Sequence, residues 1–186
     1  NMKTVWVRHG QSEYNVQDIY TGWHDPELTE LGYQQALEIA EKLSKKYLEI
    51  AEIYSSDLRR SYNTAKIIVD NTSWSCDIKI TPEIRERDYG DWSGKSKDQL
   101  HKELGEELFL AIRRGWYIGP NNGESLKDTA GRVAGFLKEL KESTLPHIIV
   151  CHGNTIRAAS VVLGYSTPDS ILNWQINTGD IVEWDY

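Results

Sequence analysis

Thr4 to Asn15 reads Thr-Val-Trp-Val-Arg-His-Gly-Gln-Ser-Glu-Tyr-Asn, and this stretch decides how the rest of the chain is interpreted. Its short β-branched and aromatic start and its stop at Gly10 favour a buried strand over a helix. Open α/β sheets bind ligands beside the carboxyl ends of their strands, where Arg8, His9 and Gly10 stand. Arg8 offers a planar fork for phosphate, His9 can act as nucleophile or acid/base, and Gly10 lets backbone approach a ligand. A strand ending in ordinary solvated residues remains the alternative.

Strands and helices alternate along the remainder of the chain. Thr29 is typical of an N-cap, and apolar residues at helical spacing follow it. The alternation predicts an α/β fold, with a mostly parallel open sheet and helices on both faces. We see no repeat or linker, so residues 1–186 are expected to form a single domain. Strands are expected at 51–55, 77–81, 147–151 and 180–184, and helices at 30–47, 58–70, 95–114 with a break near Gly105, 124–142 and 155–163.

Composition narrows the class of protein. A formal net charge of -7 argues against a nucleic-acid binder. Small anions remain candidate ligands, because screening over about 8 Å makes the local field count. No apolar run approaches the ~18 residues of a membrane span and no signal peptide is evident, so a soluble, cytoplasmic protein is expected. Neither the two cysteines nor the five histidines show metal-ligand spacing, so we expect no metal site.

A later apolar strand ends like the first one. Ile149-Val150-Cys151-His152-Gly153-Asn154 echoes Val5-Trp6-Val7-Arg8-His9-Gly10. Two parallel strands with such ends can converge at one crevice of the sheet. We therefore expect His9 and His152 to lie close together.

Six motifs occur in order along the chain, from Arg8 to the Cys151-His152-Gly153-Asn154 stretch. Their identity, order and spacing resemble the histidine phosphatase superfamily, and within it the cofactor-dependent phosphoglycerate mutases. The resemblance covers nearly the whole chain. The motifs are Arg8-His9-Gly10-Gln11-Ser12-Glu13-Tyr14-Asn15, Thr21-Gly22-Trp23 with Leu28-Thr29-Glu30-Leu31-Gly32, Ser56-Asp57-Leu58-Arg59-Arg60-Ser61, Glu86-Arg87-Asp88-Tyr89-Gly90, Gly123-Glu124-Ser125-Leu126 and Cys151-His152-Gly153-Asn154.

The resemblance implies that a phosphoryl group moves through a phosphohistidine on His9. Neighbouring arginines would lower the pKa of His9 and favour the neutral nucleophile, and a backbone carbonyl would hold its other ring nitrogen. By the same resemblance Arg8, Arg59 and His152 would bind the phosphoryl oxygens, whose charge is spread over three atoms in the transition state. A solvated residue at the start of a helix is the alternative for Arg59. Only one arginine of the Arg59-Arg60 pair matches the family position, so we expect Arg60 to be solvated.

Glu86 is implied as the general acid/base, although composition alone does not distinguish it from the other carboxylates nearby. Ser12 and Asn15 are expected to donate hydrogen bonds near the phosphoryl group. Turn formation is the alternative for both. Gly153 and Asn154 complete the expected phosphate side of the site.

The balance between mutase and phosphatase depends on the substrate's far end. The resemblance assigns the distal anionic groups to Thr21, Gly22, Tyr89, Lys97, Arg113 and Arg114; a solvated helix end is the alternative for the two arginines. Two departures favour phosphatases: residues 90–95 read more like that branch, and the loop at 117–123 and the end at Tyr186 are short, which predicts leakage to water.

We therefore expect interconversion of 3- and 2-phosphoglycerate with some phosphatase activity, a reaction of glycolysis, and 2,3-bisphosphoglycerate as phosphoryl primer. A dedicated broad-specificity phosphomonoesterase and a catalytically silent phosphate-binding protein are the alternatives. The expected partners are small phosphorylated metabolites, with no nucleic acid and no membrane; a homodimer is left open.

Overall fold

The computed structural model describes residues 1–186, and its centre is a five-stranded sheet. In chain order the strands are β1 (Lys3–Arg8), β2 (Glu52–Ser55), β3 (Ile78–Ile80), β4 (His147–Cys151) and β5 (Ile181–Asp185). Their order across the sheet is β3-β2-β4-β1-β5, and only β5 runs antiparallel to its neighbour. The predicted mostly parallel open sheet is confirmed.

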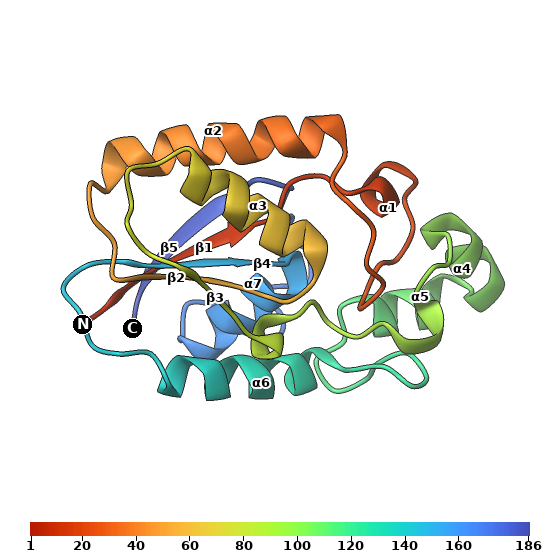
Figure 1. The fold of residues 1–186 in the computed structure, drawn as a ribbon. Coiled ribbons are helices and arrows are strands. Elements are labelled where there is room, and N and C mark those ends of the chain that lie inside the picture. The colour runs from red at the N-terminus through yellow and green to blue at the C-terminus, as the bar shows by residue number, and fades with distance from the viewer.

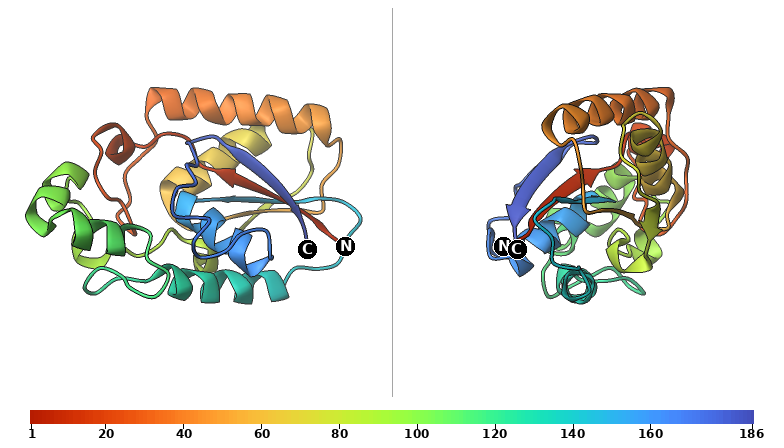
Figure 2. Two further views of the ribbon diagram at one scale, coloured as in Figure 1. Left: turned by 180° about the vertical axis from the view of Figure 1, so that it is seen from behind. Right: turned by 60° about the vertical axis from the view of Figure 1, so that its left-hand side comes forward.

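Helices cover both faces of this sheet (Figure 1). Helices α2 (Glu30–Lys46) and α3 (Arg59–Asp70) lie on one face, and α6 (Leu126–Lys138) and α7 (Gly153–Val162) lie on the other. Three further helices, α1 (Glu13–Val16), α4 (Lys97–Leu104) and α5 (Glu106–Arg113), gather beyond the carboxyl ends of the parallel strands. The two termini lie together at the opposite end of the molecule (Figure 2).

Several boundaries differ from the expected ones. The break expected near Gly105 is confirmed, because Gly105 has a φ of +80° that interrupts the helical path, whereas α4 begins at Lys97 rather than at residue 95. The helix expected to run to residue 142 ends at Lys138. Two short 3₁₀ turns, η1 (Pro82–Ile84) and η2 (Gly90–Trp92), lie between β3 and α4, where neither a strand nor a helix was expected.

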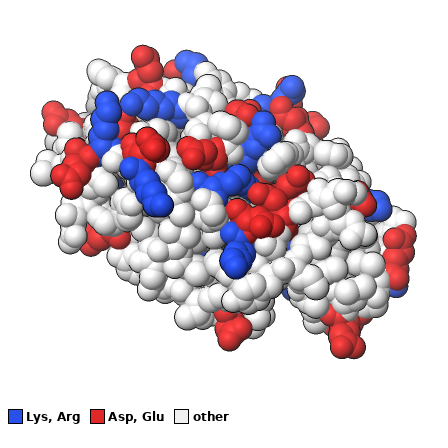
Figure 3. Space-filling model, turned by 90° about the horizontal axis from the view of Figure 1, so that it is seen from below, with Lys and Arg blue, Asp and Glu red and all other residues white.

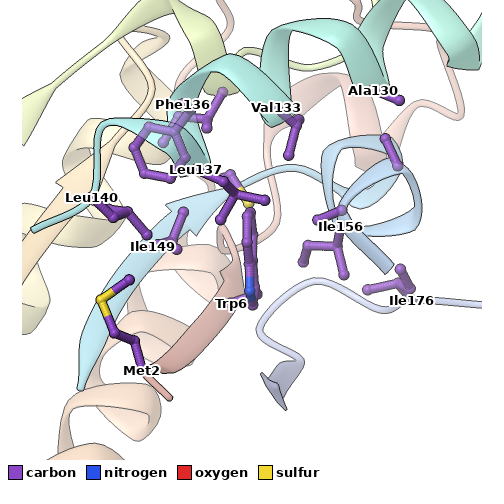
Figure 4. Packing of buried hydrophobic residues seen from close by; sticks show 14 residues of the cluster. Met2, Trp6, Ala130, Val133, Phe136, Leu137, Leu140, Ile149, Ile156 and Ile176 are labelled. Carbon is purple, nitrogen blue, oxygen red and sulfur yellow. The ribbon is translucent and has the colours of Figure 1, made fainter. Parts of the chain in front are cut away.

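The sheet separates two apolar clusters because successive side chains of β1 point to opposite faces. Trp6 packs with Val133, Phe136 and Leu137 of α6 (Figure 4), whereas Val5 and Val7 pack toward α2 and α3. Both faces of β1 are thus buried, which explains why the strand reads as a nearly continuous apolar run.

A third, aromatic cluster supports the end of the molecule that carries α4 and α5. Tyr89, Trp92 and Phe109 stack there, with ring centroids 6.3 Å and 5.7 Å apart along the series. Through Leu100 and Phe109 this cluster joins α4 and α5 to the segments that carry Tyr20, Tyr89 and Trp92. No helix of the structure is both long enough and apolar enough to span a bilayer.

Candidate active site

A cleft of about 350 Å³ opens at the carboxyl ends of β1 and β4. The parallel register pairs Arg8 with Cys151, so the two strands deliver Arg8-His9 and His152-Gly153 side by side. The lining holds only two acidic side chains, Asp18 and Glu86, against six basic ones. On the α6 face, by contrast, acidic and basic side chains are interspersed (Figure 3). The excess of basic side chains in the cleft therefore favours anionic ligands, although the whole chain has a net negative charge. Its basic residues are Arg8, Arg60, Lys97, Arg113, Arg114 and Arg157.

His9 lies buried in the floor of the cleft as a neutral imidazole. Its Nδ1 is 2.6 Å from the carbonyl oxygen of Gly10, an acceptor only, so Nδ1 carries the proton and Nε2 keeps its lone pair. Burial first, and then the charges of Arg60 and Arg8, hold the pKa of His9 well below its ordinary value. The expected carbonyl contact and direction of shift are both present, and the nitrogen that remains free is a competent nucleophile.

Two buried guanidinium groups flank His9. Arg8 donates to the carbonyl of Ile176, while its Nε is buried without a protein partner. Arg60 is 1% exposed and donates to the carbonyls of Gly22 and His24, both at 2.9 Å. Burial lowers the pKa of Arg60 to about 10, so the group remains charged at neutral pH. An unpartnered buried donor beside fixed positive charge is what a phosphoryl oxygen requires.

The expected placement of Arg59 is wrong. Its side chain is 49% exposed and pairs with Asp25 (3.3 Å) and Glu27 (3.0 Å), away from the cleft lining. The reason is helical phase. Arg60 shares the buried face of α3 with Thr64 and Ile68, four and eight residues later, and Arg59 points outward. That spacing was available in the sequence and would have selected Arg60.

His152 lies beside His9 rather than in the cleft lining. The two ring centroids are 5.0 Å apart, and His152 Nε2 is 2.7 Å from the hydroxyl oxygen of Ser56. Burial and the charge of Arg60 lower the pKa of His152 well below its ordinary value. Its Nδ1 is buried without a protein partner. The predicted contact between His152 and a phosphoryl oxygen stays a prediction.

Ser12 does not line the cleft. It is the N-cap of α1, where its hydroxyl accepts from the amide of Asn15 at 3.3 Å and the Ser12 amide donates to Asn15 Oδ1 at 2.8 Å. Asn15 does reach the cleft lining. The turn-forming alternative therefore describes Ser12, and the expectation that it donates to the phosphoryl group is not supported by its position.

Glu86 enters the cleft from an irregular segment. Its Oε1 accepts from the amide of Arg87 at 2.8 Å, and no cation lies within ion-pair distance of its carboxylate. The carboxylate is thus free to exchange a proton with a ligand. The other expected residues that reach the cleft lining are Thr21, Gly22, Tyr89, Lys97, Arg113, Arg114, Gly153 and Asn154.

Arg157 and Gln175 are among the cleft residues that were not anticipated. Arg157 donates to Asn154 Oδ1 at 2.8 Å and to the carbonyl of Trp174 at 2.9 Å, and Asn154 in turn donates to the Tyr89 hydroxyl at 2.7 Å. Gln175 accepts from Arg114 at 3.3 Å. Arg157 follows Gly153 by four residues on α7, a spacing that could have indicated it. Gln175 lies in a segment without regular structure and carries no comparable signal.

A buried neutral histidine, converging guanidinium groups and a free carboxylate at the end of an α/β sheet define a phosphate-handling enzyme. The comparisons give the family. The family model of the histidine phosphatase superfamily (branch 1) matches residues 4–186, and the chain belongs to this superfamily.

Relatives and solved structures point to two activities within it. The chain is 38% identical over 185 residues to a 2,3-bisphosphoglycerate-dependent phosphoglycerate mutase of Bartonella henselae, covering 94% of this chain and 87% of the relative. A mutase of the same name from Beijerinckia indica is 40% identical over 184 residues, with the same coverage. A mycobacterial glucosyl-3-phosphoglycerate phosphatase in complex with VO3 superposes with a TM-score of 0.84 at 30% identity, covering 98% of this chain and 90% of that one. A mutase or phosphatase of this superfamily is what these likenesses support.

Proposed function

We propose that the protein interconverts 3- and 2-phosphoglycerate through a phosphohistidine on His9, with 2,3-bisphosphoglycerate as primer and with appreciable hydrolysis. His9 Nε2 forms a bond to phosphorus as the ester P–O bond breaks, and Glu86 gives its proton to the leaving oxygen. In the return step the acceptor hydroxyl loses its proton to Glu86 and attacks phosphorus, which breaks the N–P bond and restores neutral His9. Arg8 and Arg60 hold the equatorial oxygens through both steps.

One observation carries the mutase assignment: the cleft has more positive charge than one phosphoryl group uses. Besides Arg8 and Arg60 beside His9, the lining contains Lys97, Arg113 and Arg114, supported by the aromatic cluster and α5. Partial burial lowers the pKa of Lys97 and of Arg114, as expected for cations that line a pocket. The Lys97 side chain is 43% exposed and lies 3.7 Å from Asp18. A substrate with a second anionic end, such as a phosphoglycerate, fits this second group of cations.

A dedicated phosphomonoesterase is the second candidate. The similarity to the mycobacterial phosphatase favours it. This chain superposes on the structures of that protein with VO3 and with inorganic phosphate with TM-scores of 0.84 and 0.80. The distinction lies in the fate of the phosphoryl group on His9: transfer to a phosphoglycerate hydroxyl or transfer to water.

A paired assay separates the two candidates. Purified protein should interconvert 3- and 2-phosphoglycerate faster than it releases inorganic phosphate, and added 2,3-bisphosphoglycerate should accelerate the interconversion. The same bisphosphate, labelled, should leave an acid-labile and base-stable adduct, since phosphoramidates of histidine have this stability pattern.

His9→Ala serves as the control, because it should lose both activities and the adduct. Phosphate release that exceeds interconversion at every primer concentration would assign the protein as a phosphatase. An adduct that persists in His9→Ala would remove the phosphohistidine mechanism altogether.

A further inference from the structure

Glu86 is supported by no helix or strand, yet its carboxylate must meet the leaving oxygen with hydrogen-bond accuracy. It lies between η1 and η2, in a segment whose own backbone hydrogen bonds are few. Arg87, inside the segment, donates from its buried guanidinium to the carbonyls of Glu124, Arg113, Ile112 and Ile118. The other groups that hold the segment come from elsewhere in the chain. The side chains that bind the backbone of this segment belong neither to the phosphate subsite nor to the second group of cations.

Arg132 of α6 binds the backbone on the near side of Glu86. Its Nη1 donates to the carbonyl of Glu83 at 2.9 Å and to that of Arg85 at 3.3 Å, and its Nη2 donates to the carbonyl of Glu86 at 3.3 Å. Three carbonyls within four residues thus converge on a single guanidinium. The planar fork of Arg can satisfy several acceptors at once, and a lysine in its place could not.

Glu124 binds the far side of the same segment. Its Oε1 accepts from the amide of Asp88 at 2.9 Å, and its own amide donates to the carbonyl of Asp88 at 2.7 Å. Glu124 and Arg132 also bind each other twice, at 2.9 Å and 2.7 Å, with both side chains mostly buried. The pair therefore brackets Glu86 from both sides through a bidentate contact.

Trp23 adds a third donor to this arrangement. Its indole Nε1 donates to the carbonyl of Glu86 at 2.8 Å, and the guanidinium of Arg132 lies 5.9 Å from its ring centroid. The anchor of the whole arrangement is rigid, because α6 begins with a capping box between Ser125 and Asp128 and packs into the core through Val133 and Phe136.

We propose that the Arg132–Glu124 ion pair is a positioning clamp for Glu86, and that its loss disables the proton-donating step while leaving the phosphate subsite able to react. The proposal rests on the proposed function, which supplies the acid role of Glu86. Within residues 83–88 the side chains of the clamp bind backbone atoms, whereas Arg8, His9 and Arg60 are held by other partners. A displacement of an acid by about 1 Å is enough to cost a large factor in rate.

The test compares two substrates of similar size that differ in their need for an acid. The leaving group of 4-nitrophenyl phosphate is a stable phenolate, which departs without a proton. The leaving group of 4-nitrobenzyl phosphate is an alkoxide, which needs a proton to depart as an alcohol. Neither carries a distal anion, so the second group of cations does not affect the comparison. The measured quantity is kcat/KM, because it reports phosphoryl transfer to His9 and excludes the later hydrolysis.

Arg132→Met should lower kcat/KM by about 100-fold for the benzyl ester, within the range of general acid catalysis, and by about threefold or less for the phenyl ester. Glu86→Gln is the benchmark and should show the same split. Glu124→Gln should follow it more weakly, and Arg132→Lys should recover only part of the benzyl activity. Lys138→Met, an exposed cation on the same helix, is the matched control and should change neither substrate.

An equal loss on both substrates in Arg132→Met, or no loss on either, would overturn the clamp. Should Arg132→Met fold poorly, as thermal melting would reveal, Glu124→Gln and Arg132→Lys carry the same comparison. The benchmark keeps the two proposals apart. If Glu86→Gln shows no split, the acid role in the proposed function fails; if it shows the split and the clamp variants do not, only the clamp fails.

Discussion

At the residue scale, the neighbouring arginines at the start of α3 show that the orientation of a side chain, and not only its chemistry, determines its role. Arg59 and Arg60 have identical chemistry, and one residue of helical phase places Arg60 in the cleft and Arg59 in solvent. A cation preorganised in a water-excluded site stabilises transferring charge, whereas an exposed ion pair contributes only about 0–1 kcal/mol. A substitution of Arg59 is therefore a matched control for the same substitution of Arg60.

Arg60→Met should lower kcat/KM for 4-nitrophenyl phosphate by about 100-fold or more, comparable with the loss of one oxyanion donor. Arg59→Met should stay within about threefold of the parent, because it loses only exposed contacts with Asp25 and Glu27. Thermal melting of both variants controls for folding. An Arg59 variant as impaired as the Arg60 variant would contradict the assignment.

The same pair shows how far sequence reasoning reaches. The environment of His9 was predictable, because Arg8 and Gly10 are its chain neighbours and a parallel sheet brings His152 alongside. The motif resemblance alone does not separate Arg59 from Arg60, whereas the helical phase of α3 does, because it places Arg60 on the buried face. Ser12 was misplaced for a related reason: a hydroxyl that caps a helix looks, in sequence, like one that meets a ligand.

At the element scale, the approach of α2 to the β1 loop depends on two glycines. A Cβ on Gly10 would overlap the backbone of Gly32, and a Cβ on Gly32 would overlap the backbone of Gln11. The amide of Gly32 also donates to the Thr29 hydroxyl at the N-cap of α2, at 3.1 Å. The motif from Leu28 to Gly32 is thus a packing requirement of the segment that carries His9.

Gly32→Ala should cost about 2–3 kcal/mol of unfolding free energy, since added atoms in a close-packed contact force backbone shifts. Gly131→Ala is the control: Gly131 lies in α6 with open space around its Cβ position, and alanine there should leave stability unchanged or raise it by up to about 1 kcal/mol. Urea unfolding of the two variants checks both. Equal stability of Gly32→Ala and the parent protein would contradict the tight contact.

Helices and strands with a regular repeat of apolar residues were predicted well from the sequence, and segments without such a repeat were not. The alternation of strands and helices gave the sheet and its two covering layers, because burial imposes a repeat on the sequence. Residues 164–180 have no such repeat, so neither Gln175 nor the carbonyl of Trp174 that holds Arg157 was foreseeable. The bracketing of Glu86 by Arg132 joins positions 46 residues apart, a contact that only the fold establishes.

At the scale of the whole molecule, the fold concentrates positive charge in a cleft of an acidic protein and buries two histidines beneath it. His9 is 2% exposed and His152 is fully buried, and the pKa values of both are held well below their ordinary value by burial and then by arginine charge. The site gains two neutral imidazoles at physiological pH. Burial of these histidines lowers the free energy of unfolding at acidic pH, because the unfolded chain binds protons that the folded chain does not.

This linkage predicts how stability depends on pH. Because both folded-state pKa values lie below the unfolded value of about 6.5, the unfolded chain binds more protons once the pH falls under that value. Stability should be full above about pH 6.5 and should fall below it, with the pair contributing a loss of about 2.5 kcal/mol between pH 7.5 and pH 5.5. Urea unfolding at the two pH values measures the loss, and carboxylates contribute little there because their unfolded pKa values are near 4. The double variant His9→Asn with His152→Asn removes both groups and should flatten the dependence, whatever its absolute stability. A double variant that loses as much stability as the parent over this interval would mean that the buried histidines are not the groups responsible.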